Sequence, residues 1–363
     1  MTYAQGPYGY GYPPPPPPPK PGVIPLAPLG FSEILTGAFS TYGRYWKPLV
    51  GVALAAYTGL GLVVGGALLA AWAAVGDQVT RLFDTPAGET PDVSDVTPMI
   101  VAFVCVWLAA MVALVLANAL VSAAAPAVLQ EAVLGRPIGF AETWQRAWSR
   151  LGAVLGSLVL TALATMLPML LALAGFAFLM AGIVSAVAAS DHAGMDDGQG
   201  LAVTGALFFL VTMAMVPLAL WLQIKFSLAP TVAVIEQQSA MGSLRRSSAL
   251  VKGSWWRTFG CLIAAGAIAG MVNFAIQQVV QAAAGLPMLT FQPGDEVTPG
   301  EVFSALGGVM AVLAIASVVT QAFIAPFQPL VMGLVYVDRR IRGENLAPAL
   351  AQQAAQQTAE HTG

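Results

Sequence analysis

Long apolar segments, separated by short clusters of charged residues, divide the chain. Uncharged segments run from Lys47 to Asp77, Asp95 to Glu131, Arg150 to Asp191, Asp197 to Lys225, Arg257 to Asp295 and Glu301 to Asp338. A helix that crosses the hydrocarbon core of a bilayer needs about 20 predominantly apolar residues, and each segment supplies that length. The pattern therefore predicts six transmembrane helices in an all-α integral membrane protein.

The segment after Arg150 is long enough for two spans divided near Pro168. A division there would move the basic cluster between Arg245 and Arg257 to the outer side of the membrane. We therefore interpret the segment as one tilted or kinked helix, and a re-entrant portion remains an alternative.

Composition and charge placement agree with a membrane location. The 363 residues are 57% hydrophobic and 9% charged, whereas a soluble domain carries about 25% charged residues. Basic residues gather in 20–47, 136–150, 245–257 and 339–342, and the intervening loops are mainly acidic. Because Lys and Arg mark the cytoplasmic side, we expect a multi-pass plasma-membrane protein with both termini in the cytoplasm. We expect no cleavable signal peptide and no nucleic-acid partner.

The two ends of the chain differ in composition from the six-span domain, which we place at 31–346. Residues 1–30 are rich in Pro, Tyr and Gly, and include an unbroken proline run from Pro13 to Pro19. Such a run favours the extended polyproline II helix, which aromatic-lined grooves recognise. We expect disordered cytoplasmic tails at 1–30 and 347–363. The first is either a flexible tail or a docking segment for a protein partner.

The membrane domain is predicted to contain three tandem repeats, each with a short interfacial helix followed by two spans. Phe31 and Phe140 occupy equivalent positions in the first two units, and Trp46 and Trp256 do so in the first and third. The even-numbered spans close on the pairs Ala125-Pro126, Ala229-Pro230 and Ala325-Pro326. Two spans return the chain to its starting side, so the three units would share one orientation.

The interfacial helix of the first unit is expected to be amphipathic. Its apolar residues recur at helical spacing: Phe31, Ile34, Leu35, Ala38, Phe39, Tyr42, Tyr45 and Trp46. Aromatic and basic side chains favour the headgroup layer of a bilayer. Candidate contacts with lipid headgroups are Arg44, Lys47, Arg245, Arg246, Lys252 and Arg257. Ordinary anchoring by positive charge on the cytoplasmic side explains the same residues.

Polar residues within the spans are costly in lipid unless they meet a partner or a watery cavity. Asn273, Gln277 and Gln281 follow one another at intervals of one helical turn, and so share a face of the fifth span. A candidate intramembrane polar cluster consists of Asn273, Gln277, Gln281, Lys225, Gln321 and Asn118. The preferred alternative is that these amides join neighbouring helices and that the Lys225 side chain reaches the interface.

Small residues one helical turn apart recur in each odd-numbered span and suggest close helix packing. The pairs are Gly61 with Gly65, Gly152 with Gly156, and Gly266 with Gly270. Chance pairs are common among 37 glycines, so the pattern supports a compact bundle only weakly.

The chain offers little material for catalysis. Its two histidines are His192, in a predicted outer loop, and His361, in the C-terminal tail. It contains no phosphate-binding GxxxxGK[ST], no CxxC and no HExxH motif. We therefore expect no enzymatic activity, no metal site and no cofactor.

Three segments carry a resemblance to a known family: SEILTGAFSTYGRYWKPLVG at 32–51, MGSLRRSSALVKGSWWRTFG at 241–260 and APFQPLVMGLVYVDRRIRGENL at 325–346. They resemble uncharacterised actinobacterial polytopic membrane proteins related to the membrane domain of glycerophosphoryl diester phosphodiesterases. The resemblance implies a six-span bundle and no activity. The phosphodiesterases keep an HRG-type motif in a separate catalytic domain, and this chain has no His-Arg pair.

The sequence leaves two functions open. The first is a non-enzymatic scaffold or accessory subunit, which rests on the proline-rich tail and the missing catalytic set. The alternative is a transporter or lipid-handling protein with a polar intramembrane cavity, which rests on the polar residues of the spans.

Overall fold

The computed structural model describes residues 22, 23, 25, 27–84, 93–190, 195–285 and 299–344. Within these residues the chain forms eleven helices and no strands. The helices in chain order are α1 (Phe31–Arg44), α2 (Trp46–Asp84), α3 (Val93–Val133), α4 (Phe140–Ser190), α5 (Met195–Met213), α6 (Met215–Phe226), α7 (Ala229–Ile235), α8 (Ala240–Val251), α9 (Trp255–Gly285), α10 (Pro299–Ile324) and α11 (Phe327–Glu344).

Six stretches of the described chain are long and apolar enough to cross a membrane. They are Trp46–Val79, Val96–Val133, Phe140–Ser185, Val203–Ile235, Trp255–Ala283 and Gly307–Glu344. The prediction of an all-α protein with six spans is therefore confirmed, and the spans imply a lipid bilayer environment. Most of the predicted tail at 1–30, apart from residues 22, 23, 25 and 27–30, and all of the predicted tail at 347–363 lie outside the described residues.

The third span is a single helix, because α4 continues through Pro168 for 51 residues. Pro168 removes one backbone hydrogen bond, but α5 packs along the C-terminal half of α4 and stabilises it. The alternatives with two spans or with a re-entrant portion are wrong, since the chain does not reverse within α4.

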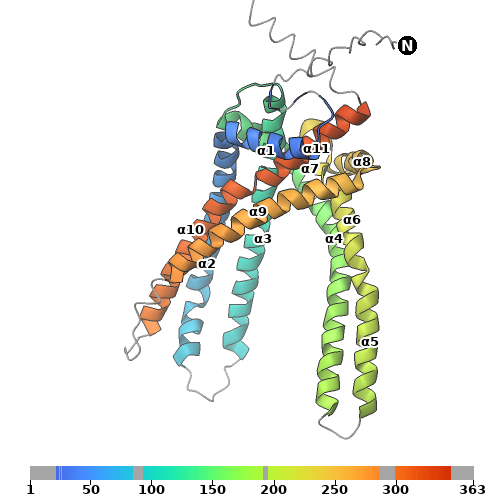
Figure 1. The fold of residues 1–363 in the computed structure, drawn as a ribbon. Helices are drawn as coiled ribbons and strands as arrows, with labels where there is room; N and C mark the ends of the chain where they lie inside the picture. Colours follow the sequence, from blue (N-terminus) through green and yellow to red (C-terminus); the bar gives the residue numbers. More distant parts are fainter. Residues whose placement is uncertain are drawn as a thin grey trace, which may run out of the picture.

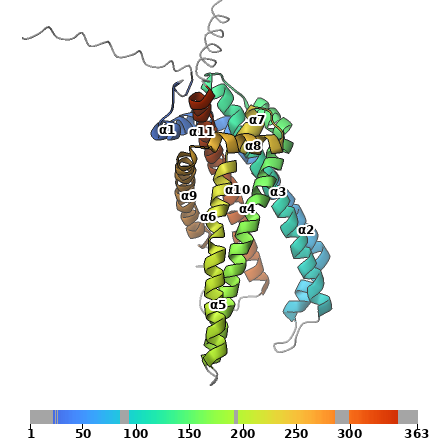
Figure 2. The same ribbon diagram turned by 90° about the vertical axis from the view of Figure 1, so that its right-hand side faces the viewer.

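The short helices gather at one end of the molecule (Figures 1 and 2). We call the "platform" the assembly of α1, α7, α8, α11 and the end of α3 after Pro126. From it the spans run in one direction as three pairs, α2 with α3, α4 with α5 and α6, and α9 with α10, and the pairs diverge away from the platform. The first and last helices both lie in the platform, so the two ends of the described chain are on the same side.

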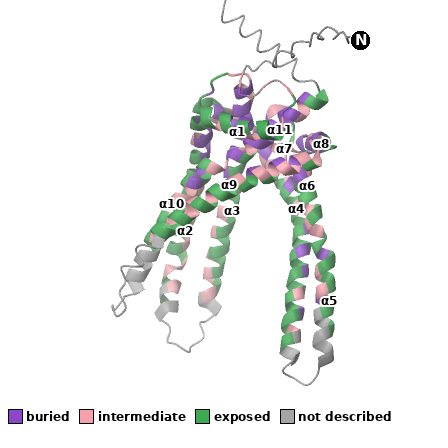
Figure 3. Ribbon diagram, in the orientation of Figure 1, coloured by how far each residue is buried: buried purple, intermediate pink, exposed green. Residues whose placement is uncertain are grey.

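Buried residues form two packed cores, one in the platform and one where α2, α3 and α4 meet close to it, and the spans are mostly exposed farther away (Figure 3). Leu129 of α3 and Leu330 and Leu334 of α11 have no exposed surface. By contrast, at most 22% of the most hydrophobic window of any span is buried. Side chains that face lipid can stay apolar, whereas the platform must bury its own apolar side chains away from water.

The expected helices before the spans are separate in two of the three units. The α1 helix ends at Arg44, and Pro48, which has no N–H to donate to the preceding turn, falls in the first turn of α2. The α8 helix ends at Val251, where Gly253 adopts a positive φ of 80°. Residues 140–150 have neither signal and form the first three turns of α4, so the expected separate helix of the second unit is absent.

The Ala-Pro pairs interrupt the helix in two of the three expected places. Pro230 lies in the first turn of α7, and Pro326 lies in the break between α10 and α11. The helix does not close at Pro126, because α3 continues to Val133 and its last residues are buried in the platform. The threefold repeat itself stays a prediction.

Candidate functional site

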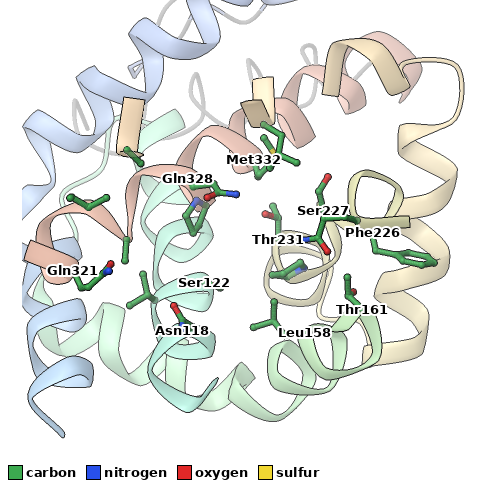
Figure 4. Close-up of a pocket in the computed structure, with 18 of the residues that line it drawn as sticks. Asn118, Ser122, Leu158, Thr161, Phe226, Ser227, Thr231, Gln321, Gln328 and Met332 are labelled. Atoms are coloured by element: carbon green, nitrogen blue, oxygen red, sulfur yellow. The ribbon is translucent and has the colours of Figure 1, made fainter. Parts of the chain in front are cut away.

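A cavity of about 400 Å³ lies beneath the platform, where all six spans come together. We call it the "six-span cavity". Tyr57 of α2, Asn118 of α3, Thr161 of α4, Gln223 of α6, Ala269 of α9 and Gln321 of α10 each contribute to its wall. The breaks before α7 and α11 also border it, since Ser227 and Ala325 line the cavity. In Figure 4, Asn118, Ser122 and Gln328 lie on one side, facing Thr161, Ser227 and Thr231 on the other.

One side chain of the wall is held in place by hydrogen bonds. The Tyr57 hydroxyl donates to Oδ1 of Asn118 at 3.0 Å, and Nδ2 of Asn118 donates to the Leu114 carbonyl at 2.9 Å. Tyr57 is 4% exposed, so its ring is fixed between the first two spans. The pair therefore gives the cavity one preorganised amide.

Three glutamine side chains on the wall have no hydrogen-bond partner among the described residues. They are Gln223, Gln321 and Gln328, which come from α6, α10 and α11. All three are exposed rather than buried in protein. Each amide can both donate and accept hydrogen bonds, so together they provide binding capacity that the protein itself does not use.

The wall of the six-span cavity is uncharged. Its polar members are hydroxyl and amide side chains, and none of the described residues that line it is Asp, Glu, Lys, Arg or His. A charged ligand would lose its hydration without gaining an ionic partner. The arrangement is therefore suited to an uncharged group that forms hydrogen bonds.

The structure divides the predicted intramembrane polar cluster. Asn118 and Gln321 line the six-span cavity, whereas Asn273, Gln277 and Gln281 do not. Asn273 follows Ala269 of the wall by about one turn of α9. The polar row therefore begins where the cavity wall ends and continues away from the platform.

Lys225, the sixth member of that cluster, lies outside the cavity wall. Its ammonium group is 4.5 Å from the centre of the Trp221 ring and 5.8 Å from the centre of the Phe226 ring. Such contacts stabilise a cation on an aromatic face. Lys225 is thus not a member of the cavity wall, and its ammonium group lies against aromatic rings instead.

The candidate lipid-headgroup contacts also fall into two groups. Arg44, Lys47, Arg245 and Lys252 are exposed and form no ion pair within the part of the chain that the structure describes. Arg246 and Arg257 are only partly exposed and pair with carboxylates of the platform. The first group alone retains charge that is free to attract anionic headgroups.

A buried carboxylate joins the two ends of the described chain. Asp338 of α11 is 0% exposed, and its Oδ1 accepts hydrogen bonds from the Leu29 amide at 2.9 Å and from Arg342 Nε at 2.8 Å. Its Oδ2 lies 3.2 Å from Arg257 Nη2, in an ion pair without hydrogen-bond alignment. Both arginines also donate to the Leu29 carbonyl. The backbone before α1 is therefore fixed to α9 and α11.

A second network closes a ring of side chains on the platform. Glu236 accepts from Arg246 Nε at 3.0 Å and from the Tyr336 hydroxyl at 2.8 Å. Arg340 donates to the Tyr336 oxygen and to Glu344. Glu344 also accepts a hydrogen bond from Arg246, which completes the ring. Burial alone would lower the pKa of Arg246, but its hydrogen bonds with Glu344 and Glu236 raise that pKa, which keeps the guanidinium charged.

Sequence reasoning missed several residues of the cavity and platform. Ser122, Thr231 and Gln328 line the cavity, but single hydroxyl and amide residues near helix ends give no periodic signal. The sequence indicated Asp338 only as the charged residue that ends the last apolar segment. Arg342, one helical turn later, was the sequence feature that could have predicted an ion pair with this carboxylate.

Comparison of the chain with family models, with curated proteins and with solved structures finds no match. The resemblance to the membrane domain of glycerophosphoryl diester phosphodiesterases therefore stays a prediction.

Proposed function

We propose that the protein is a transporter or lipid-handling membrane protein that binds an uncharged polar group in the six-span cavity. The observation that carries this proposal is the convergence of unpartnered amides from different helices on one uncharged cavity. An amide in a membrane domain is costly when nothing forms hydrogen bonds with it. This free-energy cost applies to Gln223, Gln321 and Gln328 unless a ligand or water in the cavity forms hydrogen bonds with them.

The experiment extracts the full-length protein from membranes without detergent and identifies the small molecules that accompany it by mass spectrometry. The variant Gln223→Leu/Gln321→Leu/Gln328→Leu removes the unpartnered amides, and Gln278→Leu is the matched control on α9, outside the cavity wall. We expect one compound to be enriched with the wild type and the control, and lost from the triple variant. Identical profiles for a folded triple variant would refute the proposal.

A scaffold role is the second candidate. It is favoured by the fixed position of the residues that follow the proline run. The Val23 amide donates to the Ala132 carbonyl at 3.2 Å, and Leu29 is held by Asp338. A tail that starts at a fixed point on the platform suits a docking segment, because its attachment to the membrane domain is rigid. Deleting residues 1–21 should abolish co-purification of a stoichiometric protein partner, and unchanged co-purification would exclude this role.

The remaining parts of the proposal concern location and chemistry. We place the protein in the plasma membrane with the platform in the cytoplasm, because the basic residues of the loops gather at the platform. A reporter enzyme fused after Gly363 should then be active only in the cytoplasm. We also propose that the protein acts without catalysing a covalent reaction.

A further inference from the structure

We infer that the ligand of the six-span cavity is a lipid with an uncharged, hydroxyl-rich headgroup, which enters the cavity sideways from the membrane. This inference rests on the proposed function, since it names the class of molecule that the cavity binds. It follows from where the cavity is closed, where it is open and which groups line it.

The cavity is closed on the platform side. Thr231 of α7 and Gln328 and Met332 of α11 form this part of the wall. Immediately behind them, Val232 and Leu330 have no exposed surface and belong to the core of the platform. A solute in the water beside the platform would have to displace this core to reach the amides.

The spans diverge away from the platform (Figure 1), and Thr161 of α4 and Ala269 of α9 line the cavity on that side. Beyond Thr161 on α4, Leu163 and Met166 are 58% and 52% exposed. On α9, Met271 and Phe274 are each 65% exposed. These large apolar side chains lie on the same spans beyond the cavity wall, and an exposed apolar surface of this kind suits contact with acyl chains.

The headgroup is identified by the uncharged wall and by its unpartnered amides. A phosphate would enter a cavity without any cationic side chain, which carries a large desolvation penalty. A hydroxyl-rich group can both accept from and donate to Gln223, Gln321 and Gln328. At about 30 Å³ for each water in the liquid, a cavity of about 400 Å³ has room for a group of sugar or glycerol size.

The polar row of α9 marks the route of entry. Asn273 and Gln277 follow the cavity wall along α9, away from the platform. A headgroup that moves along this row keeps hydrogen-bond partners while its acyl chains remain among the exposed apolar side chains. Gln277 is therefore expected to affect how fast the lipid enters, rather than how tightly it is held.

The experiment places the full-length protein in phosphatidylcholine nanodiscs that contain a photo-crosslinking lipid with its diazirine on the acyl chain. The headgroup of the probe is glycerol (diacylglycerol), glucose (glucosyl diacylglycerol) or anionic phosphatidylglycerol. Intact-protein mass spectrometry measures the adduct. We expect adducts with the two uncharged lipids and about fivefold less adduct for each cavity glutamine changed to Leu, which corresponds to about 1 kcal/mol per hydrogen bond.

Variants on α9 test the route separately. Gln277→Leu should slow the appearance of the adduct after lipid is added and leave the final amount unchanged, while Gln278→Leu should change neither. Displacement of the lipid by free glucose at equal concentration would overturn the inference and leave the proposed function standing. Equal labelling by phosphatidylglycerol would overturn both, because both require an uncharged group. If no probe labels the protein and free glucose does not bind either, both fail.

Discussion

Asp338 and Leu29 are 309 residues apart in the chain, yet the Leu29 amide donates a 2.9 Å hydrogen bond to the buried carboxylate of Asp338. This contact joins the backbone before the first span to the helix that follows the last one. It makes the platform a closed structure, in which the beginning and the end of the membrane domain stabilise each other.

Replacing Asp338 by Asn should destabilise the platform by about 2 kcal/mol, because it leaves Arg257 and Arg342 without their shared carboxylate. The partial exposure of both arginines keeps the loss below that of a fully buried pair. Thermal unfolding in nanodiscs measures the change, with Arg44→Gln as a control for loss of an unpaired surface charge. Equal melting temperatures for Asp338→Asn and wild type would contradict the role assigned to the carboxylate.

Glu236 and Arg246 should show a favourable coupling of about 1 kcal/mol in a double-mutant cycle. Arg246 Nε lies 3.0 Å from both carboxylate oxygens, and the pair is only partly exposed. The variants Glu236→Gln, Arg246→Gln and the double variant are compared by thermal unfolding. Additive losses would mean that the two side chains stabilise the platform independently.

Gly175→Ala should destabilise the contact between α4 and α5 by about 1 to 3 kcal/mol. A Cβ atom at Gly175 would overlap the side chain of Thr212. Adding Thr212→Ala should recover part of the loss. Gly266→Ala is the matched control, since no atom lies within 4 Å of the position that its Cβ would take, and it should be neutral or stabilising. The prediction fails if the two glycine variants unfold at the same temperature.

Anionic lipid should stabilise the protein through Arg44, Lys47, Arg245 and Lys252, at about 1 kcal/mol for each basic residue near the surface. Changing these four residues to Gln should remove most of the rise in melting temperature that phosphatidylglycerol produces over phosphatidylcholine. High salt should reduce the same rise in the wild type. The variant Arg257→Gln should lower stability in both lipids and keep the difference between them, because Arg257 is paired with Asp338.

The spans could be predicted from the sequence because each depends on one local property, an apolar segment of sufficient length. The glycine pairs were less informative, because close packing depends on which helices meet. At Gly152, Gly266 and Gly270 an added Cβ would meet no atom within 4 Å, whereas at Gly156 it would approach Ala240. The close contact at Gly175 was not anticipated.

The cavity could be anticipated only in part. Polar residues in apolar segments pointed to Asn118 and Gln321, which both line the cavity, because an intramembrane amide needs an explanation wherever it lies. The sequence could not separate them from Gln281, since the divergence of the spans decides which amides meet. Thr231 and Gln328 lie after helix breaks, where a hydroxyl or amide is ordinary and carries no signal.

The hydrogen bond between Leu29 and Asp338 can form only late in the synthesis of the chain. Asp338 is synthesised 309 residues after Leu29, so at 5 to 20 residues per second the N-terminal backbone waits roughly 15 to 60 s for its partner. The first five spans and α10 precede Asp338 in the chain, so the contact can form only after they have been synthesised. A complete platform therefore requires a complete membrane domain, and a truncated product lacking α11 would leave the Leu29 backbone without Asp338 and Arg342.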